Sequence, residues 1–149
     1  MAASPSPFRP GASLERINAD RAGTLIERLG IEITGIGHDS LSGTMPVDER
    51  TRQPYGLLHG GASVALAETL GSVAANLCLD PRTHIAVGLE INANHVRAVT
   101  SGEVSGTASA IHIGRSTQVW DIRITDDQDR LVCVSRLTIA VVERNRTGS

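Results

Sequence analysis

Aromatic residues are scarce and lysine is missing from this sequence of 149 residues. Phe8, Tyr55 and Trp120 are the only aromatic residues, and all fourteen basic residues are arginine. A protein that binds single-stranded nucleic acid needs aromatic stacking platforms and a positively charged groove. This chain has three aromatic rings and a formal net charge of −2. We therefore expect no nucleic-acid partner.

Cysteine is also scarce, and no long apolar run is present. Cys78 and Cys133 lie in apolar segments and form neither a metal-ligand spacing nor a disulfide framework. We found no HExxH or CxxC motif and no glycine-rich phosphate loop, so we expect no metal site. Because no apolar run could span a bilayer and the amino terminus lacks a signal pattern, we expect a cytoplasmic protein without a membrane partner.

What is present fits one globular domain, since 40% of the residues are hydrophobic and 20% are charged. Residues 1–24 start with a stretch rich in Pro, Ser and Ala, so we expect a poorly ordered segment. Within it, Ser13 could cap a short helix over Leu14–Ala22. We expect the domain itself to cover residues 25–142 and a frayed tail to follow at 143–149.

Hydrophobic periodicity predicts the order of the elements. A helical pattern begins near Gly60 and ends near Pro81, and before it a hairpin of two strands is expected over 31–36 and 41–47. After the helix the period changes to two, and strands are expected over 85–94, 103–113, 116–125 and 130–142. On the first of these, one face would carry Ile85, Val87, Leu89, Ile91 and Ala93. Consecutive hairpins favour an α+β fold, with an antiparallel sheet against one long helix.

The long helix carries one residue that does not fit its surroundings, Glu68. Its neighbours are almost all apolar or small, and a helix that is apolar nearly all round is normally buried. A buried carboxylate costs several kcal/mol unless it is paired, protonated or used in chemistry. Because one sheet face cannot cover every side of such a helix, we expect a partner subunit to cover the rest.

The start of this helix is suited to binding a carbonyl oxygen. Unpaired amides and a partial positive charge gather at a helix N-terminus, and Gly60 and Gly61 leave room for a ligand there. One of these amides could stabilise an oxyanion. Gln53 supplies a further amide donor from the preceding loop, and His59 directly precedes the helix. The alternative interpretation is that the glycines only permit a tight turn and that His59 caps the helix.

Glu68 and Gly60 are too far apart to act on one carbonyl within a single chain. Eight residues of helix separate them, which corresponds to about 12 Å along the helix axis. Ser72 lies one turn after Glu68 on the same face, and it could simply satisfy the carboxylate structurally. If Glu68 instead acts as a base or nucleophile together with Gly60, the two residues must come from different subunits.

A second polar patch lies at an expected strand–turn–strand. It combines an arginine, a hydroxyl group and turn amides, which suit a phosphate, and Arg97 could assist from an earlier strand. A solvated surface is an equally good explanation for these arginines. The residues of this patch are His112, Ile113, Gly114, Arg115 and Ser116.

At these positions the sequence resembles the hotdog-fold acyl-CoA thioesterases. The similar subgroup contains the Glu-dependent 4-hydroxybenzoyl-CoA and 1,4-dihydroxy-2-naphthoyl-CoA thioesterases. The resemblance covers about residues 25–142. Its motifs are Gln53 to Ser63 followed by Ala67-Glu68, Val87 to Arg97, and Ser135 to Thr138.

The resemblance implies a sheet wrapped around the central helix and a homodimer or homotetramer with the active site at the dimer interface. Gln53 and the Gly60 amide would bind the thioester carbonyl, and His59 would support their loop. Glu68 of the other subunit would be nucleophile or general base, and Ser72 would place it or the attacking water. The CoA moiety would lie near Arg97, His112, Gly114, Arg115 and Ser116. No cofactor is implied.

The substrate implied by the resemblance is an aromatic acyl-CoA of the hydroxybenzoyl or 1,4-dihydroxy-2-naphthoyl type, the latter belonging to menaquinone-type quinone synthesis. Phenylacetyl-CoA and an aryl group on a carrier protein are alternatives within the same reaction class. A hotdog module that binds acyl-CoA without turnover is the alternative outside it. The combination of Glu68, Gln53 and Gly60 favours an enzyme, because a sensor needs no buried base.

Overall fold

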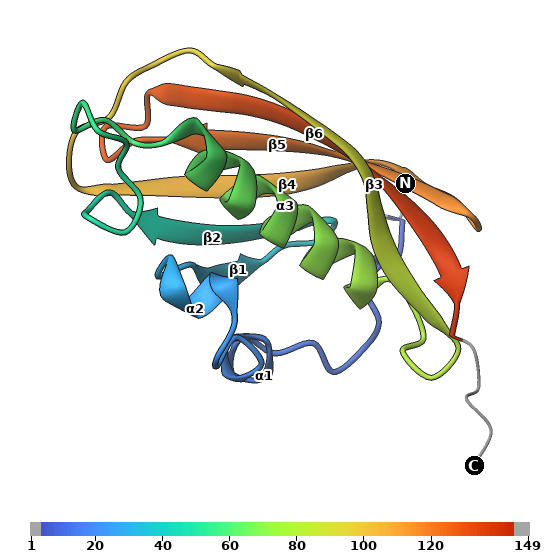
Figure 1. Cartoon of the computed structure of the whole chain (residues 1–149). Coiled ribbons are helices and arrows are strands. Elements are labelled where there is room, and N and C mark those ends of the chain that lie inside the picture. Colours follow the sequence, from blue (N-terminus) through green and yellow to red (C-terminus); the bar gives the residue numbers. More distant parts are fainter. Residues whose placement is uncertain (1–3, 145–149) are drawn as a thin grey trace.

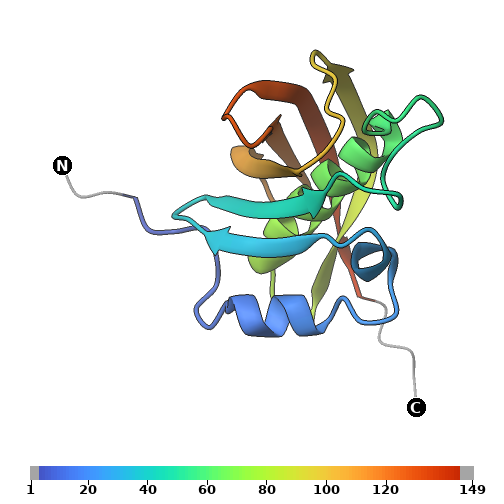
Figure 2. The same cartoon turned by 90° about the vertical axis from the view of Figure 1, so that its left-hand side faces the viewer.

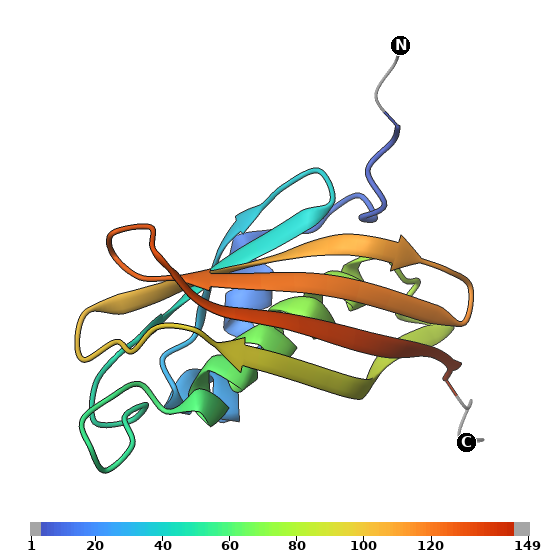
Figure 3. The same cartoon turned by 90° about the horizontal axis from the view of Figure 1, so that it is seen from above.

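The computed structural model describes residues 4–144, and in it one antiparallel sheet curves around a long helix (Figure 1). Figure 3 shows the strands from above with the long helix beneath them. In chain order the elements are α1 (Leu14–Ala19), α2 (Leu25–Arg28), β1 (Glu32–Ile36), β2 (Ser40–Pro46), α3 (Gly60–Leu77), β3 (His84–His95), β4 (Glu103–Ile113), β5 (Thr117–Thr125) and β6 (Leu131–Glu143).

The six strands have the order β1-β2-β4-β5-β6-β3, and every neighbouring pair is antiparallel. The expected α+β layering is confirmed. The expected chain of consecutive hairpins is wrong at one point, because β3 and β4 are not neighbours. The connection over residues 96–102 instead crosses the sheet, and β3 pairs with β6 at an edge.

Helix α3 packs one face against the sheet and leaves the opposite stripe partly open. Its buried residues are small or aliphatic and recur with helical spacing: Ala62, Ser63, Leu66, Ala67, Leu70, Gly71, Ala74 and Ala75. The opposite stripe includes Val64, Glu68 and Ser72, all of intermediate exposure. A single chain therefore buries α3 on one side only, and the expected cover for the other side is not supplied by the described residues.

Strand β3 contains a bulge that the periodicity did not predict. Its register with β6 shifts between Gly88 and Glu90, so Leu89 is an extra residue. Because one inserted residue exchanges the two faces of a strand, Val87 is 42% exposed and Leu89 65% exposed. The prediction that Val87 and Leu89 share one face of the strand with Ile91 is therefore wrong. Gly88 takes the inward position and faces α3.

The described part of the amino-terminal segment packs against the domain through Phe8 and Arg9. Phe8 is 9% exposed and stacks on Trp120, with ring centroids 6.3 Å apart. The Arg9 N–H donates to Leu77 O at 2.9 Å. Figure 2 shows the segment passing the tip of the β1–β2 hairpin before α1. The helix capped by Ser13 is confirmed, although it ends at Ala19.

Candidate active site

The first four amides of α3 are not equivalent, and this difference defines one half of the site. His59 is the N-cap residue, and its Nδ1 accepts from the Gly61 N–H at 2.8 Å. The amides of Ala62 and Ser63 donate to the His59 carbonyl. Among residues 4–144, the Gly60 N–H has no acceptor. The amide best placed to meet a ligand oxygen at this helix end is therefore that of Gly60.

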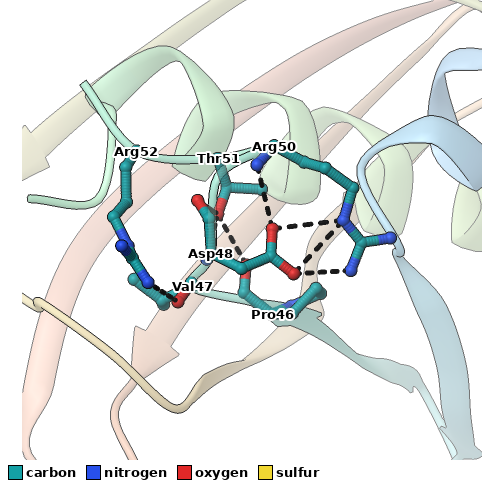
Figure 4. A network of polar contacts seen from close by, with 6 residues as sticks. All are labelled: Pro46, Val47, Asp48, Arg50, Thr51 and Arg52. Carbon is teal, nitrogen blue, oxygen red and sulfur yellow. Dashed lines mark hydrogen bonds and ion pairs between the residues drawn. The ribbon is translucent and has the colours of Figure 1, made fainter. Parts of the chain in front are cut away.

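The loop before α3 is tied to the end of β2 by the buried side chain of Thr51 (Figure 4). Its hydroxyl donates to Pro46 O at 2.7 Å and accepts from the Asp48 N–H at 3.1 Å. Its backbone carbonyl accepts from the His59 N–H at 2.8 Å. Arg50 donates to the Asp48 carboxylate and lowers the pKa of that group. Thr51 thus fixes the start of the loop and the residue that caps α3.

Gln53 belongs to this loop and borders a cavity of about 400 Å³ at the start of α3. Its backbone N–H donates to Leu57 O, and its side-chain oxygen accepts from the Tyr55 N–H. The carboxamide NH₂ has no acceptor among the described residues. Gly60 lines the same cavity, so the two residues border one space within one chain. Their joint action on a substrate carbonyl stays a prediction.

The sequence did not single out His95 as a member of this cavity. The ring packs so closely on Gly60 that a Cβ there would lie 2.9 Å from His95 Nε2. Only glycine fits this position without displacing the ring. Arg97 lines the cavity too, and its Nε donates to Leu131 O at 3.3 Å. His95 lies within the stretch from Val87 to Arg97 that carries the resemblance, but the sequence does not place it beside Gly60, because that contact is made only by the folded chain.

Glu68 forms the second half of the site, together with Ser72 and Gly88. Ser72 Oγ donates to Glu68 Oε1 at 3.4 Å, one helical turn away. The carboxylate lies directly against Gly88, where a Cβ would overlap Glu68 Oε1. The bulge in β3 turns this glycine toward α3. Glycine within a strand is a known signal for a bulge or a close approach, and that signal could have identified Gly88.

The two halves of the site are separate within one chain. Glu68 does not line the cavity of Gln53 and Gly60, and α3 is continuous between Gly60 and Glu68. The helical rise places them about 12 Å apart along the axis. One chain therefore has a free amide at the start of α3 and a carboxylate on the same helix, but it does not bring both to the same atom.

The residues expected near CoA also fall into two places. Arg97 belongs to the cavity at the start of α3 and contacts the beginning of β6 at Leu131. The turn over residues 112–116 contacts the other end of β6, where the Val141 N–H donates to Ser116 O at 2.9 Å. A single chain thus does not bring Arg97 together with His112, Gly114, Arg115 and Ser116.

Between residues 4 and 144, no three side chains of His, Cys, Asp or Glu gather closely enough to hold a metal ion. None of the helices described is both long and apolar enough to cross a membrane.

Comparison with known proteins gives a consistent result. The model of the thioesterase superfamily matches residues 55–133. The chain is 52% identical to the 1,4-dihydroxy-2-naphthoyl-CoA hydrolase of Escherichia coli K12, over 87% of this chain and 95% of that protein. It is 55% identical to the proofreading thioesterase EntH of Cronobacter turicensis, over 87% of this chain and 94% of that protein.

Solved structures agree with these sequence matches. The fold superposes on the crystal structure of a mutant thioesterase from Pseudomonas aeruginosa with a TM-score of 0.92 and 50% sequence identity. That match covers 93% of this chain and 100% of the other. The wrapped sheet and central helix are thus the hotdog arrangement of these enzymes, as the resemblance implied. The chain belongs to the thioesterase superfamily and is a hotdog-fold thioesterase.

Proposed function

We propose that this enzyme hydrolyses an aromatic acyl-CoA to the free acid and CoA at a site shared by two subunits. The observation that carries the proposal is the unoccupied Gly60 amide at one end of α3 together with the Glu68 carboxylate two turns further on. Thioester hydrolysis needs a polarised carbonyl and an activated nucleophile. One chain has both groups but holds them about 12 Å apart.

The Gly60 end of α3 polarises the thioester carbonyl in this proposal. The Gly60 N–H and the Gln53 carboxamide donate to the carbonyl oxygen as it becomes an oxyanion. Each such donor is worth about 2.7–4 kcal/mol in the transition state. His59 keeps the helix end in place, because its ring accepts from Gly61 while its backbone amide is held by Thr51.

Glu68 of the other subunit supplies the attack. As nucleophile, its carboxylate oxygen bonds to the thioester carbon while the carbon–sulfur bond breaks, and water then hydrolyses the resulting anhydride. As general base, it takes a proton from the water that attacks the same carbon. Both routes release CoA as thiol and the acyl group as acid. The Ser72 hydroxyl orients the carboxylate through its hydrogen bond to Glu68 Oε1.

The position of β3 in the sheet supports a homodimer as part of this proposal. Strand β3 lies at the edge of the sheet, and its side chains Val87 and Leu89 are exposed. An edge strand of twelve residues with exposed apolar side chains favours pairing with another strand. Twofold pairing of β3 with its copy would run the two α3 helices in opposite directions. The Gly60 end of one helix then approaches the Glu68 turn of the other, and two such dimers could form a homotetramer.

The aromatic acyl group is supported by the named relatives. One is a 1,4-dihydroxy-2-naphthoyl-CoA hydrolase and another a proofreading thioesterase, so we propose an aryl-CoA substrate and a role in quinone synthesis as the first case to test. Phenylacetyl-CoA and an aryl carrier protein remain the alternatives. CoA would be held by Arg97 of one subunit, with the turn at His112, Gly114, Arg115 and Ser116 contributing from another.

The experiment measures free thiol release from a panel of aryl-CoA and alkyl-CoA esters. Wild type is compared with Glu68→Ala and with Glu32→Ala, which removes an exposed carboxylate of β1. Glu68→Ala should lower kcat about 10³-fold or more, because it removes the attacking or proton-accepting group. Glu32→Ala should match wild type.

Two results would count against the mechanism. If the Glu68→Ala variant hydrolyses the esters as fast as wild type, Glu68 takes no part in the reaction. Wild type that binds aryl-CoA esters without releasing thiol would make the chain a non-catalytic acyl-CoA-binding module.

A further inference from the structure

A second cavity, of about 540 Å³, lies between the amino-terminal segment and the open stripe of α3. This volume is within the range of ligand pockets, about 300–1,000 Å³. Its walls come from the segment before α1, from α1 itself, from α2, and from the last turns of α3. Its lining includes Arg9, Arg16, Ile17, Ser72, Val73 and Leu77.

Ser72 joins this cavity to the reactive carboxylate. It lines the cavity, and its hydroxyl donates to Glu68 Oε1. Asn76 lines the cavity one turn further on, about 12 Å from Glu68 along the helix axis. The cavity therefore begins beside the position of the thioester carbon and continues along α3, away from Gly60.

The aliphatic side chains that line the cavity are partly buried, whereas most of its charged residues are exposed, and we call these charged residues its rim. Ile17, Ile26, Val73 and Leu77 supply aliphatic side chains. The rim charges are Arg9, Arg16, Asp20 and Arg21.

Three of these rim residues are cationic, and they differ in what they already bind. Arg9 forms an ion pair with Asp80 at 3.5 Å. Arg21 donates to Ile31 O at 2.7 Å. The guanidinium of Arg16 is exposed and has no hydrogen-bond or ion-pair partner among residues 4–144. Arg16 is therefore the rim cation whose donors can turn to a ligand, and a guanidinium matches a carboxylate with two parallel hydrogen bonds.

We propose that this cavity holds the acyl group of the substrate and that Arg16 selects acyl groups with a carboxylate at the end remote from the thioester. The inference rests on the proposed function, because that function places the thioester carbon at Glu68. The nucleotide of CoA does not fit here, since the long pantetheine arm separates it from the thioester whereas the cavity starts one turn from Glu68. The amino-terminal segment and α1 thereby become the specificity wall of the enzyme.

The test compares two CoA esters of an aromatic acid that differ only by a carboxylate at the far end of the acyl group. Arg16→Gln should lower kcat/KM for the acidic ester about tenfold relative to the neutral ester, as expected for one lost charged hydrogen bond. Asp20→Asn removes the rim carboxylate and should raise kcat/KM for the acidic ester relative to the neutral ester. Arg28→Gln changes an exposed arginine of α2 outside the cavity. It should leave kcat/KM for the acidic ester relative to the neutral ester unchanged. Equal effects of Arg16→Gln on both esters would overturn the proposal.

Binding to the Glu68→Gln protein, measured by calorimetry, separates this inference from the proposed function. Adding Arg16→Gln should weaken binding of the acidic ester about tenfold and leave free CoA unaffected. If free CoA is weakened as much as the ester, the cavity holds the nucleotide and the inference is wrong. If wild type releases no thiol from any ester, the proposed function fails. The effect of Arg16→Gln on binding of the acidic ester, compared with its effect on binding of free CoA, still tests the cavity.

Discussion

At the scale of single residues, the position of the Glu68 carboxylate depends on the absence of a side chain at Gly88. The two residues come from different elements, and the bulge in β3 turns the glycine toward α3. The atom that a Cβ would meet first is the end of a flexible side chain. A larger residue at this position would therefore move the carboxylate while leaving the sheet in place.

The first prediction concerns Gly88→Ala. We expect kcat to fall about 100-fold, the cost associated with displacing a reacting group by about 1 Å, while the melting temperature stays close to that of wild type. Gly35→Ala is a matched control, since a Cβ there would meet only Ser42 Cβ at an ordinary 3.7 Å. Thiol-release kinetics and thermal melting measure both quantities. Full activity in Gly88→Ala would show that the carboxylate does not need this space.

The sequence could identify those site residues that contrast with their neighbours. Glu68 is a carboxylate in an apolar helix, and Gly60 directly follows His59 at a helix start. His95 could not be found in this way, because its contact with the start of α3 is made only by the folded chain. Gly88 differs from its apolar neighbours, and a glycine within a strand is a signal for a bulge or a close approach, but the sequence does not show that the group approaching it is Glu68.

At the scale of elements, the loop between β2 and α3 depends on the Thr51 hydroxyl. This group satisfies one carbonyl and one amide of the loop, and the Thr51 carbonyl holds the residue that caps α3. The loop also carries Gln53. A shift of the loop would therefore move Gln53 and the start of α3, the two parts that we propose bind the thioester carbonyl.

The second prediction is that Thr51→Val lowers the free energy of unfolding by about 1–3 kcal/mol, because it leaves two polar backbone groups without a partner. It should also lower kcat, since Gln53 moves with the loop. Thr51→Ser keeps the hydroxyl and should restore both properties. Urea unfolding and thiol-release assays measure the two effects. If Thr51→Ser were as inactive as Thr51→Val, the hydroxyl would not be the cause.

The turn between β5 and β6 gives a pH-dependent prediction. Asp126 accepts from Arg130 Nε and from two backbone amides, and the hydrogen bond from Arg130 lowers the pKa of Asp126 to about 2. The ordinary value near 3.9 applies in the unfolded chain. Because the pKa of Asp126 is lower in the folded than in the unfolded chain, its ionisation stabilises the folded state. This contribution is complete above the ordinary pKa and is lost as the pH falls toward 2.

We therefore expect Asp126→Asn to melt below wild type at pH 7 and the difference to shrink between pH 4 and pH 2. Thermal melting of both proteins across this range measures the effect. A difference that stays constant with pH would show that the charge of Asp126 does not contribute through this ionisation.

Most element boundaries were predictable, because periodicity changes sharply where an element begins. The strand over 103–113 and the helix start at Gly60 are confirmed. The bulge at Leu89 was not predicted, because a strict period of two in the sequence hides a single extra residue. Burial of Phe8 was missed for a related reason, since a segment rich in proline can still place one aromatic ring on Trp120.

At the scale of the whole molecule, sheet order decides which strand is free to pair with another subunit. Local pattern could not give this order, because β3 pairs with β6, some forty residues away in sequence for pairs such as Asn92 and Arg136. The proposed dimer follows from that edge position and from the separation of Gly60 from Glu68. In this dimer, each site takes Gln53 and Gly60 from one subunit and Glu68 from the other.

Mixing two inactive variants tests this sharing directly. Glu68→Ala and Gln53→Ala each remove one half of every site in their own homodimers, so each should have little activity alone. A mixed dimer restores one complete site, formed by Gln53 of one subunit and Glu68 of the other. With random pairing, half of the dimers are mixed and one of their two sites is intact, which gives about a quarter of wild-type activity.

The measurement is thiol release by the two variants co-expressed in equal amounts, compared with each variant alone at the same total concentration. We predict recovery to about a quarter of wild-type activity for the mixture. No recovery, in mixtures shown to contain mixed dimers through two different affinity tags, would mean that Gln53 and Glu68 act within one chain and would contradict the shared site.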